Sequence, residues 1–249
     1  MLTRRQLLVS AAGAASVVLL DRDRADAALS WPRHPGQIIK DDTVRSHGPI
    51  MFIGDSTTAK SCDAMGKALT RRDVGPYRVD LNLARLISID HPLRPSAITA
   101  VQRARTEGFD QDGTGEAAYL IGLGFPDVLA GDLCKVFYKD PINVTAQIVE
   151  PLLAAIGPNR TVAFLNLYGT KSSKSSRAKQ FNAGLAALQP SWPRLHIIDW
   201  ASTAKRHRWW HKLDGFHYTY RGGLERQRFV VDAMATTADL RGADLAALQ

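Results

Sequence analysis

The sequence predicts an α/β protein in which helices cover both faces of a doubly wound parallel sheet of five strands. Short apolar runs recur five times between residues 49 and 198, with helix-compatible segments between them. Three of the runs, 49–54, 118–123 and 161–167, are almost continuously apolar, which is typical of strands buried on both faces. The 249-residue chain is 45% apolar and 22% charged, an ordinary composition for a globular protein.

The first predicted strand, 49–54, is an apolar run that ends in a glycine. A helix-compatible stretch follows at 57–72, and a second short strand is expected at 77–81. The next helix is expected at 96–107, where Ser96 is suited to cap the N-terminus. Strands and helices therefore alternate from the start of the domain.

The second half of the chain continues this alternation. Four apolar residues spaced i, i+3, i+4 and i+7 predict an amphipathic helix over 142–156: Val149, Leu152, Leu153 and Ile156. Another helix ends at Pro190 and carries an apolar stripe of Phe181, Leu185 and Leu188. The remaining predicted elements are strands at 118–123, 161–167 and 195–198 and a final helix at 222–238. Together they predict a three-layer, flavodoxin-like arrangement.

The N-terminus predicts an export signal. Arg4-Arg5 precede an apolar run, Leu7–Leu20, that is too short to span a bilayer, and Ala25-Asp26-Ala27 matches a cleavage site. Paired arginines are typical of a twin-arginine signal. An uncleaved N-terminal anchor is the alternative. The expected organisation is a signal peptide at 1–27, a lead-in segment at 28–48 and one domain at 49–240.

Charge and cysteine content narrow the range of functions. Lys and Arg outnumber Asp and Glu by 32 to 24, but the excess is scattered and does not indicate nucleic-acid binding. The sequence contains no glycine-rich nucleotide motif and no metal-ligand spacing, so we expect neither a cofactor nor a metal. Two alternatives stay open for Cys62 and Cys134: a disulfide in an oxidising compartment, or two unpaired buried thiols.

Candidate catalytic residues follow the strands, because ligands of open α/β sheets bind at the carboxyl ends of the strands. Gly54-Asp55-Ser56 follows the first strand, and the glycine permits a sharp turn that places Ser56 at the start of the next helix. There the Ser56 hydroxyl would be exposed and its N–H could stabilise an oxyanion. Taken alone, Ser56 or Thr57 would more commonly cap a helix.

A second group of candidates follows the last strand. Asp214 precedes His217 by three residues, ahead of the final helix. A carboxylate so placed can orient the imidazole and stabilise its protonated form, which is the general-base half of a serine hydrolase. The combination of Ser56 after the first strand and this pair after the last predicts nucleophilic catalysis.

These two segments resemble the SGNH (GDSL-type) hydrolase family, and the resemblance covers most of residues 49–238. Further segments look like its actinobacterial branch: Ile156-Gly157-Pro158, 162–167, Phe181-Asn182 and Ile198-Asp199-Trp200. The resemblance implies that Ser56 is the nucleophile, His217 the general base and Asp214 its orienting acid.

The chain departs from the family at two oxyanion positions. Ala84 stands where the family has a glycine, although its backbone N–H remains available. The Gly-x-Asn-Asp block reads Gly124-Phe125-Pro126-Asp127, so the asparagine donor is lost, and proline has no N–H. The expected oxyanion donors are the N–H groups of Ser56 and Ala84, with Asn82 as a candidate substitute.

Three residues are candidates for substrate binding: Asp55, Phe125 and Trp210. Tryptophan can line an acyl or sugar pocket, although aromatic residues more often pack in the core. Residues 171–177 form a polar, basic segment expected to be a loop on the ligand side of the sheet. Such a loop is either simply solvated or able to hold an anionic group.

The sequence as a whole predicts an exported bacterial serine esterase or acyltransferase, secreted, periplasmic or envelope-associated. It would act on an acylated small molecule, glycan or glycolipid through a covalent acyl-enzyme. We expect a monomer without an integral membrane segment in the mature chain. The alternative, favoured by Pro126, is a catalytically impaired domain that binds cell-envelope carbohydrate.

Overall fold

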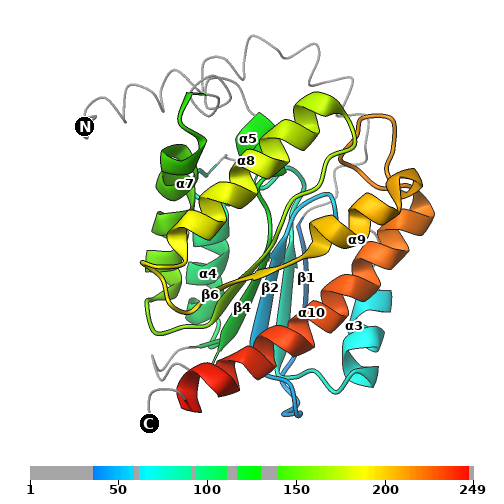
Figure 1. The fold of residues 1–249 in the computed structure, drawn as a ribbon. Helices are drawn as coiled ribbons and strands as arrows, with labels where there is room; N and C mark the ends of the chain where they lie inside the picture. The colour runs from blue at the N-terminus through cyan, green and yellow to red at the C-terminus, as the bar shows by residue number, and fades with distance from the viewer. Residues whose placement is uncertain (1–35, 59–61, 91–93, 111–116, 130–138, 247–249) are drawn as a thin grey trace.

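The computed structural model describes residues 36–58, 62–90, 94–110, 117–129 and 139–246 (Figure 1). The predicted signal at 1–27 lies outside these residues, as do Cys134 and the side chain of Cys62. Among the described residues, no helix has the length and apolar character needed to cross a membrane.

The sheet has six strands, in the spatial order β1-β3-β2-β4-β5-β6. Their bounds are β1 Gln37–Asp41, β2 Ile50–Gly54, β3 Tyr77–Leu81, β4 Ala118–Gly122, β5 Val162–Leu165 and β6 Leu195–Ile198. Strands β2 to β6 are parallel to one another, whereas β1 pairs antiparallel with β3. The chain leaves β2 toward one face of the sheet and leaves its neighbour β4 toward the opposite face, at the carboxyl ends of the two strands.

The prediction of five strands is wrong, because β1 adds a sixth from within the expected lead-in segment. Its sequence, Gln-Ile-Ile-Lys-Asp, pairs residue by residue with β3, from Gln37 opposite Leu81 to Asp41 opposite Tyr77. An edge strand needs few buried side chains, and most of β1 is exposed. It therefore lacks the apolar run that predicted β2, β4 and β5.

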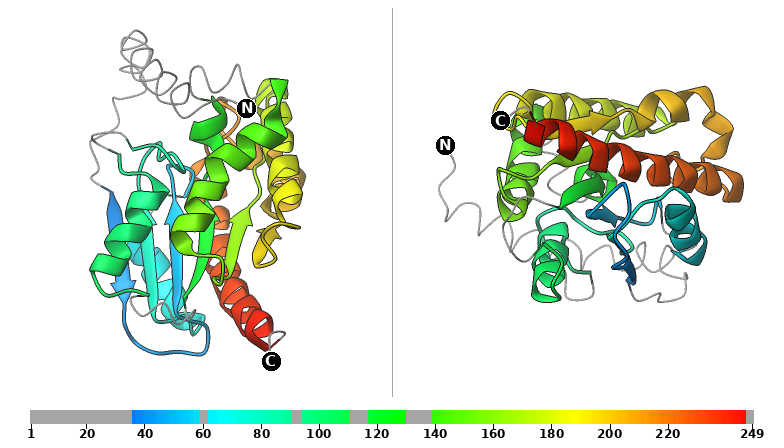
Figure 2. Two further views of the ribbon diagram at one scale, coloured as in Figure 1. Left: turned by 90° about the vertical axis from the view of Figure 1, so that its left-hand side faces the viewer. Right: turned by 90° about the horizontal axis from the view of Figure 1, so that it is seen from below.

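Helices cover both faces of the sheet. Their bounds are α3 Cys62–Arg71, α4 Ala97–Thr106, α5 Phe125–Leu129, α7 Pro141–Ile156, α8 Ser172–Leu188, α9 Trp200–Arg206 and α10 Tyr220–Ala246, with a 3₁₀ turn, η1, at Arg208–Trp210. In the left view of Figure 2, α4 and α7 lie in front of the sheet and α10 lies behind it. This arrangement confirms the predicted α/β class.

Alternate residues of β2, β4 and β5 enter two separate cores. Met51 and Ile53 of β2 pack in the core under α4, α7 and α8, whereas Ile50 and Phe52 pack in the core under α3, α9 and α10. The four apolar positions predicted for α7 are all buried, as is the predicted stripe of α8. The Ser96 hydroxyl accepts a hydrogen bond from Thr99 N–H at 3.3 Å and caps α4, as expected.

One local prediction is wrong. Residues 172–177 form the first turns of α8 rather than a loop, with Lys171 at the N-cap position. Serine, lysine and arginine are compatible with an exposed helical surface, so polarity alone did not separate a loop from a solvated helix.

Candidate active site

Ser56 lies in a tight turn directly after β2. Residues 56–58 form the turn, which Thr58 N–H closes by donating to Asp55 O at 3.1 Å. Helix α3 begins only at Cys62, so the expectation that Ser56 starts the helix is wrong. The turn nevertheless leaves the hydroxyl half-buried at the carboxyl end of the sheet.

The structure brings Ser56, His217 and Asp214 together from opposite ends of the domain. Ser56 Oγ lies 3.0 Å from His217 Nε2, and His217 Nδ1 lies 2.7 Å from Asp214 Oδ2. Both distances are hydrogen bonds, and they use different nitrogens of one imidazole. A base in this position can accept the serine proton while the carboxylate holds the ring in place.

The Asp214 carboxylate is held in its charged form. Burial disfavours the charge, but hydrogen bonds from Phe216 N–H, the His217 ring and His217 N–H outweigh it, so the pKa of Asp214 is lowered. Between these residues Gly215 adopts φ +87°, and its carbonyl accepts from Thr170 N–H at 2.8 Å. The chain thus folds back so that Asp214 supports both the backbone and the side chain of His217.

One aromatic ring packs against the imidazole, and a second packs against the first. The Phe216 ring lies 4.1 Å from the His217 ring, and Phe125 lies 5.5 Å from Phe216. The Lys174 ammonium group is 5.5 Å from the centre of the Phe216 ring, near the start of α8. Phe125 was a predicted substrate residue. Phe216 was missed, although its place beside His217 in the sequence was the available signal.

Asp55 directs a carboxylate oxygen into the turn that carries Ser56. Thr57 N–H and the Thr57 hydroxyl donate to Asp55 Oδ1 at 2.8 and 2.7 Å. Asp55 is buried, and burial raises its pKa despite these bonds. This predicted substrate residue therefore has contacts that brace the backbone around Ser56.

The predicted oxyanion residues lie at the carboxyl end of β3. Asn82 N–H donates to Gly54 O at 3.1 Å, which ties this loop to the end of β2. Ala84 adopts φ +48°, a left-handed conformation that normally favours glycine. The side-chain nitrogen of Asn82, Nδ2, lies beside Gly36, and a Cβ added at Gly36 would be 3.0 Å from it. It is therefore on the β1 side of β3, whereas Ser56 follows β2 on the other side.

The segment that contains Pro126 begins α5. Gly124 has φ +128° and packs directly on Phe181, so a Cβ there would lie 2.8 Å from the ring. Asp127 is buried, and its Oδ1 accepts from Ile87 N–H at 3.0 Å. Burial, with a smaller contribution from the charge of Asp55, raises the pKa of Asp127 to about 7. Below pH 7 the Asp127 carboxyl group is therefore mostly neutral.

Trp210, the third predicted substrate residue, packs in the core. It is 9% exposed and stacks on His207 at 4.1 Å and on Trp200 at 6.1 Å. The Arg226 guanidinium, also buried, lies 4.6 Å from the Trp200 ring. His211 is buried beside this group, and burial lowers its pKa to about 4, so its imidazole is neutral at pH 7. Long-range packing of this kind leaves no sequence motif.

Comparison with known proteins shows the fold. No family model matches the sequence, and no curated protein matches it. The structure matches the lipase/acylhydrolase from Enterococcus faecalis with a TM-score of 0.52 at 14% identity, covering 75% of this chain and 95% of that one. It also matches a member of the lipolytic protein G-D-S-L family from Veillonella parvula, with a TM-score of 0.50 at 14% identity, covering 76% and 94%.

The fold and the site together define an α/β protein with a Ser–His–Asp arrangement at the carboxyl edge of its sheet. The two matched proteins share this fold along nearly their whole length. The chain therefore has the fold of GDSL-type lipolytic acylhydrolases.

Proposed function

We propose that the chain is a serine esterase or acyltransferase that acts on ester-linked acyl groups. The observation that carries the proposal is the continuous hydrogen-bonded series from Ser56 Oγ through His217 to Asp214. The match to lipolytic enzymes, at 14% identity, supports the fold on which such chemistry would take place.

In the proposed reaction, Ser56 Oγ attacks the carbonyl carbon of the ester as His217 Nε2 takes the hydroxyl proton. The tetrahedral intermediate then collapses, the C–O bond to the alcohol breaks, and His217 returns the proton to the departing alkoxide. Water or a glycan hydroxyl next attacks the acyl-Ser56 ester and gives its proton to His217. The bond between the acyl carbon and Ser56 Oγ then breaks, and His217 returns the proton to Ser56 Oγ. Asp214 stays ionised throughout and stabilises the imidazolium.

The negative charge of the tetrahedral intermediate requires donors that are in position before the reaction. We assign this role to the N–H groups of Ser56 and Ala84. The left-handed backbone of Ala84 supports the assignment, because it preserves a glycine-like conformation at this position. Asn82 remains a candidate third donor, and its position on the β1 side of β3 is an argument against it.

The setting that we propose is the bacterial cell envelope. Residues 1–27 have the features of a twin-arginine signal, and the basic chain suits an anionic envelope. The proposed substrates are O-acylated glycans or glycolipids, processed by a monomer of the actinobacterial type of this fold.

The test uses purified wild type and Ser56→Ala with a short-chain nitrophenyl ester and a fluorophosphonate probe. We expect Ser56→Ala to retain the wild-type circular dichroism spectrum while it loses both turnover and labelling. His217→Ala should also lose turnover. Labelling of Ser56→Ala at the wild-type level would refute the assignment of the nucleophile.

A second candidate function rests on Pro126. Loss of one oxyanion donor commonly lowers kcat by 10²–10³-fold, which would leave a domain that binds acylated carbohydrate with little turnover. The same assay separates the two functions: turnover that depends on Ser56 supports the enzyme. Binding of an acylated glycan that is equal in wild type and Ser56→Ala, without turnover in either, supports the binding domain.

A further inference from the structure

The loop that carries Asp214 and His217 also exposes large apolar side chains. Trp209 is 65% exposed, Leu213 is 93% exposed and Tyr220 is 74% exposed. Across the described part of the chain seven large hydrophobic side chains are exposed, so nearly half of them lie within this one segment. Isolated exposed apolar residues are normal, but several that are grouped together mark an interaction surface.

Backbone hydrogen bonds join the two sides of the loop between η1 and α10, which these three residues border or occupy. Thr219 N–H donates to Trp210 O at 2.7 Å, and Lys212 N–H donates to His217 O at 2.8 Å. The two sides of the loop are therefore held together, with Trp209 and Tyr220 at its base and Leu213 near its tip. Leu213 is therefore exposed on a loop whose backbone is held by hydrogen bonds.

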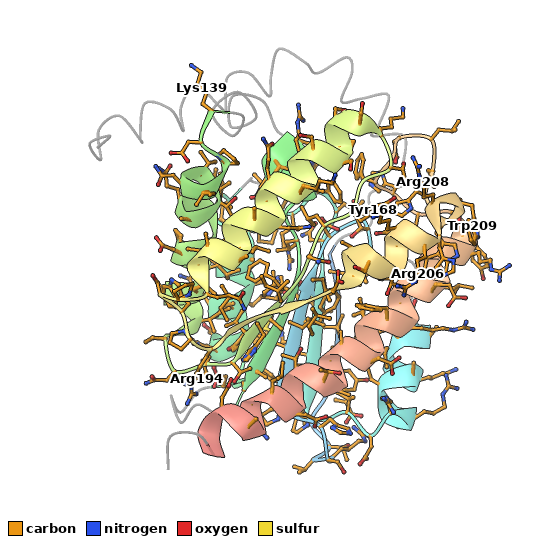
Figure 3. All side chains as sticks on the ribbon, viewed as in Figure 1. Lys139, Tyr168, Arg194, Arg206, Arg208 and Trp209 are labelled. Carbon is orange, nitrogen blue, oxygen red and sulfur yellow. The ribbon has the colours of Figure 1, made fainter. Side chains whose placement is uncertain are left out.

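Positive charge surrounds the same loop. Residues 200–224 contain five basic side chains and one acidic side chain, Asp214, which pairs with His217. Figure 3 places Arg206, Arg208 and Trp209 around the end of α9, and the Arg208 guanidinium donates to Thr170 O at 3.3 Å. We define the Trp209 surface as Arg206, Arg208, Trp209, Leu213, Tyr220 and Arg221, all of which are exposed.

We propose that the Trp209 surface docks on a bilayer that contains anionic lipid. Tryptophan and tyrosine favour the headgroup region, and arginine is attracted to anionic headgroups. Leu213 distinguishes a bilayer from a glycan, because a fully exposed aliphatic side chain gains when it enters an apolar medium but does not stack on sugars. The combination of an apolar tip, aromatic flanks and a cationic border is typical of interfacial binding.

Docking by this surface would bring the catalytic site to the membrane. Leu213 directly precedes Asp214, and Tyr220 follows His217 by three residues. If the proposed function holds, the substrates that reach Ser56 are acyl esters of lipids or glycolipids in that membrane. The docking itself does not depend on catalysis, so each can fail without the other.

The first test uses an environment-sensitive fluorophore on cysteine in two variants of the full chain. Leu213→Cys carries the probe in the Trp209 surface. Val44→Cys, at an 82% exposed position between β1 and β2, carries it at the opposite end of the sheet. Wild type treated with the same reagent gives the background from Cys62 and Cys134. We expect vesicles of phosphatidylglycerol and phosphatidylcholine to blue-shift the probe at 213 only, and pure phosphatidylcholine to shift it much less.

The second test reverses charge. Arg206→Glu/Arg208→Glu should weaken co-sedimentation with the anionic vesicles at least tenfold while turnover of a dissolved ester is unchanged. Lys40→Glu/Lys139→Glu, with the same change in net charge, should bind as wild type does, and so should Ser56→Ala.

Three results would overturn the proposal. The first is an unshifted probe at 213, the second is an equal shift at 44, and the third is wild-type vesicle binding by Arg206→Glu/Arg208→Glu. Binding of soluble polygalacturonate through these arginines, without a probe shift on vesicles, would assign the surface to an anionic glycan instead. Absence of turnover in the wild type, with vesicle binding intact, would refute only the proposed function.

Discussion

Asp127→Asn is expected to remove a pH dependence of stability that the buried carboxyl group creates. Asp127 Oδ1 accepts from Ile87 N–H, and Oδ2 has no hydrogen-bond partner among the described residues. The pKa of about 7 means that the folded protein holds a proton here at pH 5–7. The unfolded chain, with a pKa of about 3.9, has released it.

The sign follows from proton linkage. Where the folded state binds more protons than the unfolded state, stability falls as pH rises. For Asp127 this interval extends from about pH 4 to about pH 7, with a slope of about 1.4 kcal/mol per pH unit. Between pH 5 and pH 8 the loss is on the order of 2–3 kcal/mol. Asparagine keeps an acceptor for Ile87 N–H and does not titrate.

The measurement is urea unfolding of wild type and Asp127→Asn at pH 5, 6, 7 and 8. Other titrating groups are common to both proteins, so the difference between the two free energies of unfolding isolates Asp127. We expect this difference to shift in favour of the variant by about 2–3 kcal/mol across the series. A difference that stays constant with pH would refute the reasoning, because it would mean that the carboxyl group ionises normally in the folded protein.

Three further predictions concern the site and export. If the missing oxyanion donor limits the rate, Pro126→Asn should raise kcat by up to about 100-fold with little change in KM. If Asn82 already supplies that donor, Asn82→Ala should lower kcat by a similar factor. Steady-state kinetics on one ester distinguish the two cases, and no change in either variant would contradict both. Gly215→Ala should destabilise the protein by about 1–2 kcal/mol and lower kcat at least tenfold. The reason is that Gly215 has φ +87° and that an added Cβ would lie 2.9 Å from Lys171 Cγ. Urea midpoints and steady-state kinetics test this prediction, and wild-type values for both would show that the loop tolerates the change. Replacing both Arg4 and Arg5 by lysine should block export, measured by cell fractionation; unchanged export would indicate the general secretory route.

Strands β2, β4 and β5 were predictable because burial on both faces leaves an apolar run in the sequence. Residues 77–81 and 195–198 match β3 and β6 exactly in their bounds. Strand β1 was not predictable in this way, because it is an exposed edge strand that is defined by its hydrogen bonds to β3 rather than by its own side chains. The register in which an edge strand pairs depends on the neighbouring strand as much as on its own sequence.

In the candidate site, too, some features could be predicted from the sequence and others could not. The proximity of Ser56 to His217 was predictable, because both follow strands whose carboxyl ends meet at one edge of the sheet. The burial of Trp210 and the position of Arg226 over Trp200 were not, since both depend on how α9, η1 and α10 pack together. The proximity of Phe125 to Phe216 likewise joins segments that are far apart in the chain.

The antiparallel pairing of β1 determines where the N-terminal part of the polypeptide enters the domain. Because Gln37 lies opposite Leu81, β1 starts at the carboxyl end of β3, the same end of the sheet at which Ser56 follows β2. A tether upstream of Gly36 would therefore hold the domain at the end of the sheet where Ser56 lies. Ser56 would then face the surface to which the protein is attached, and the opposite end of the sheet would be free.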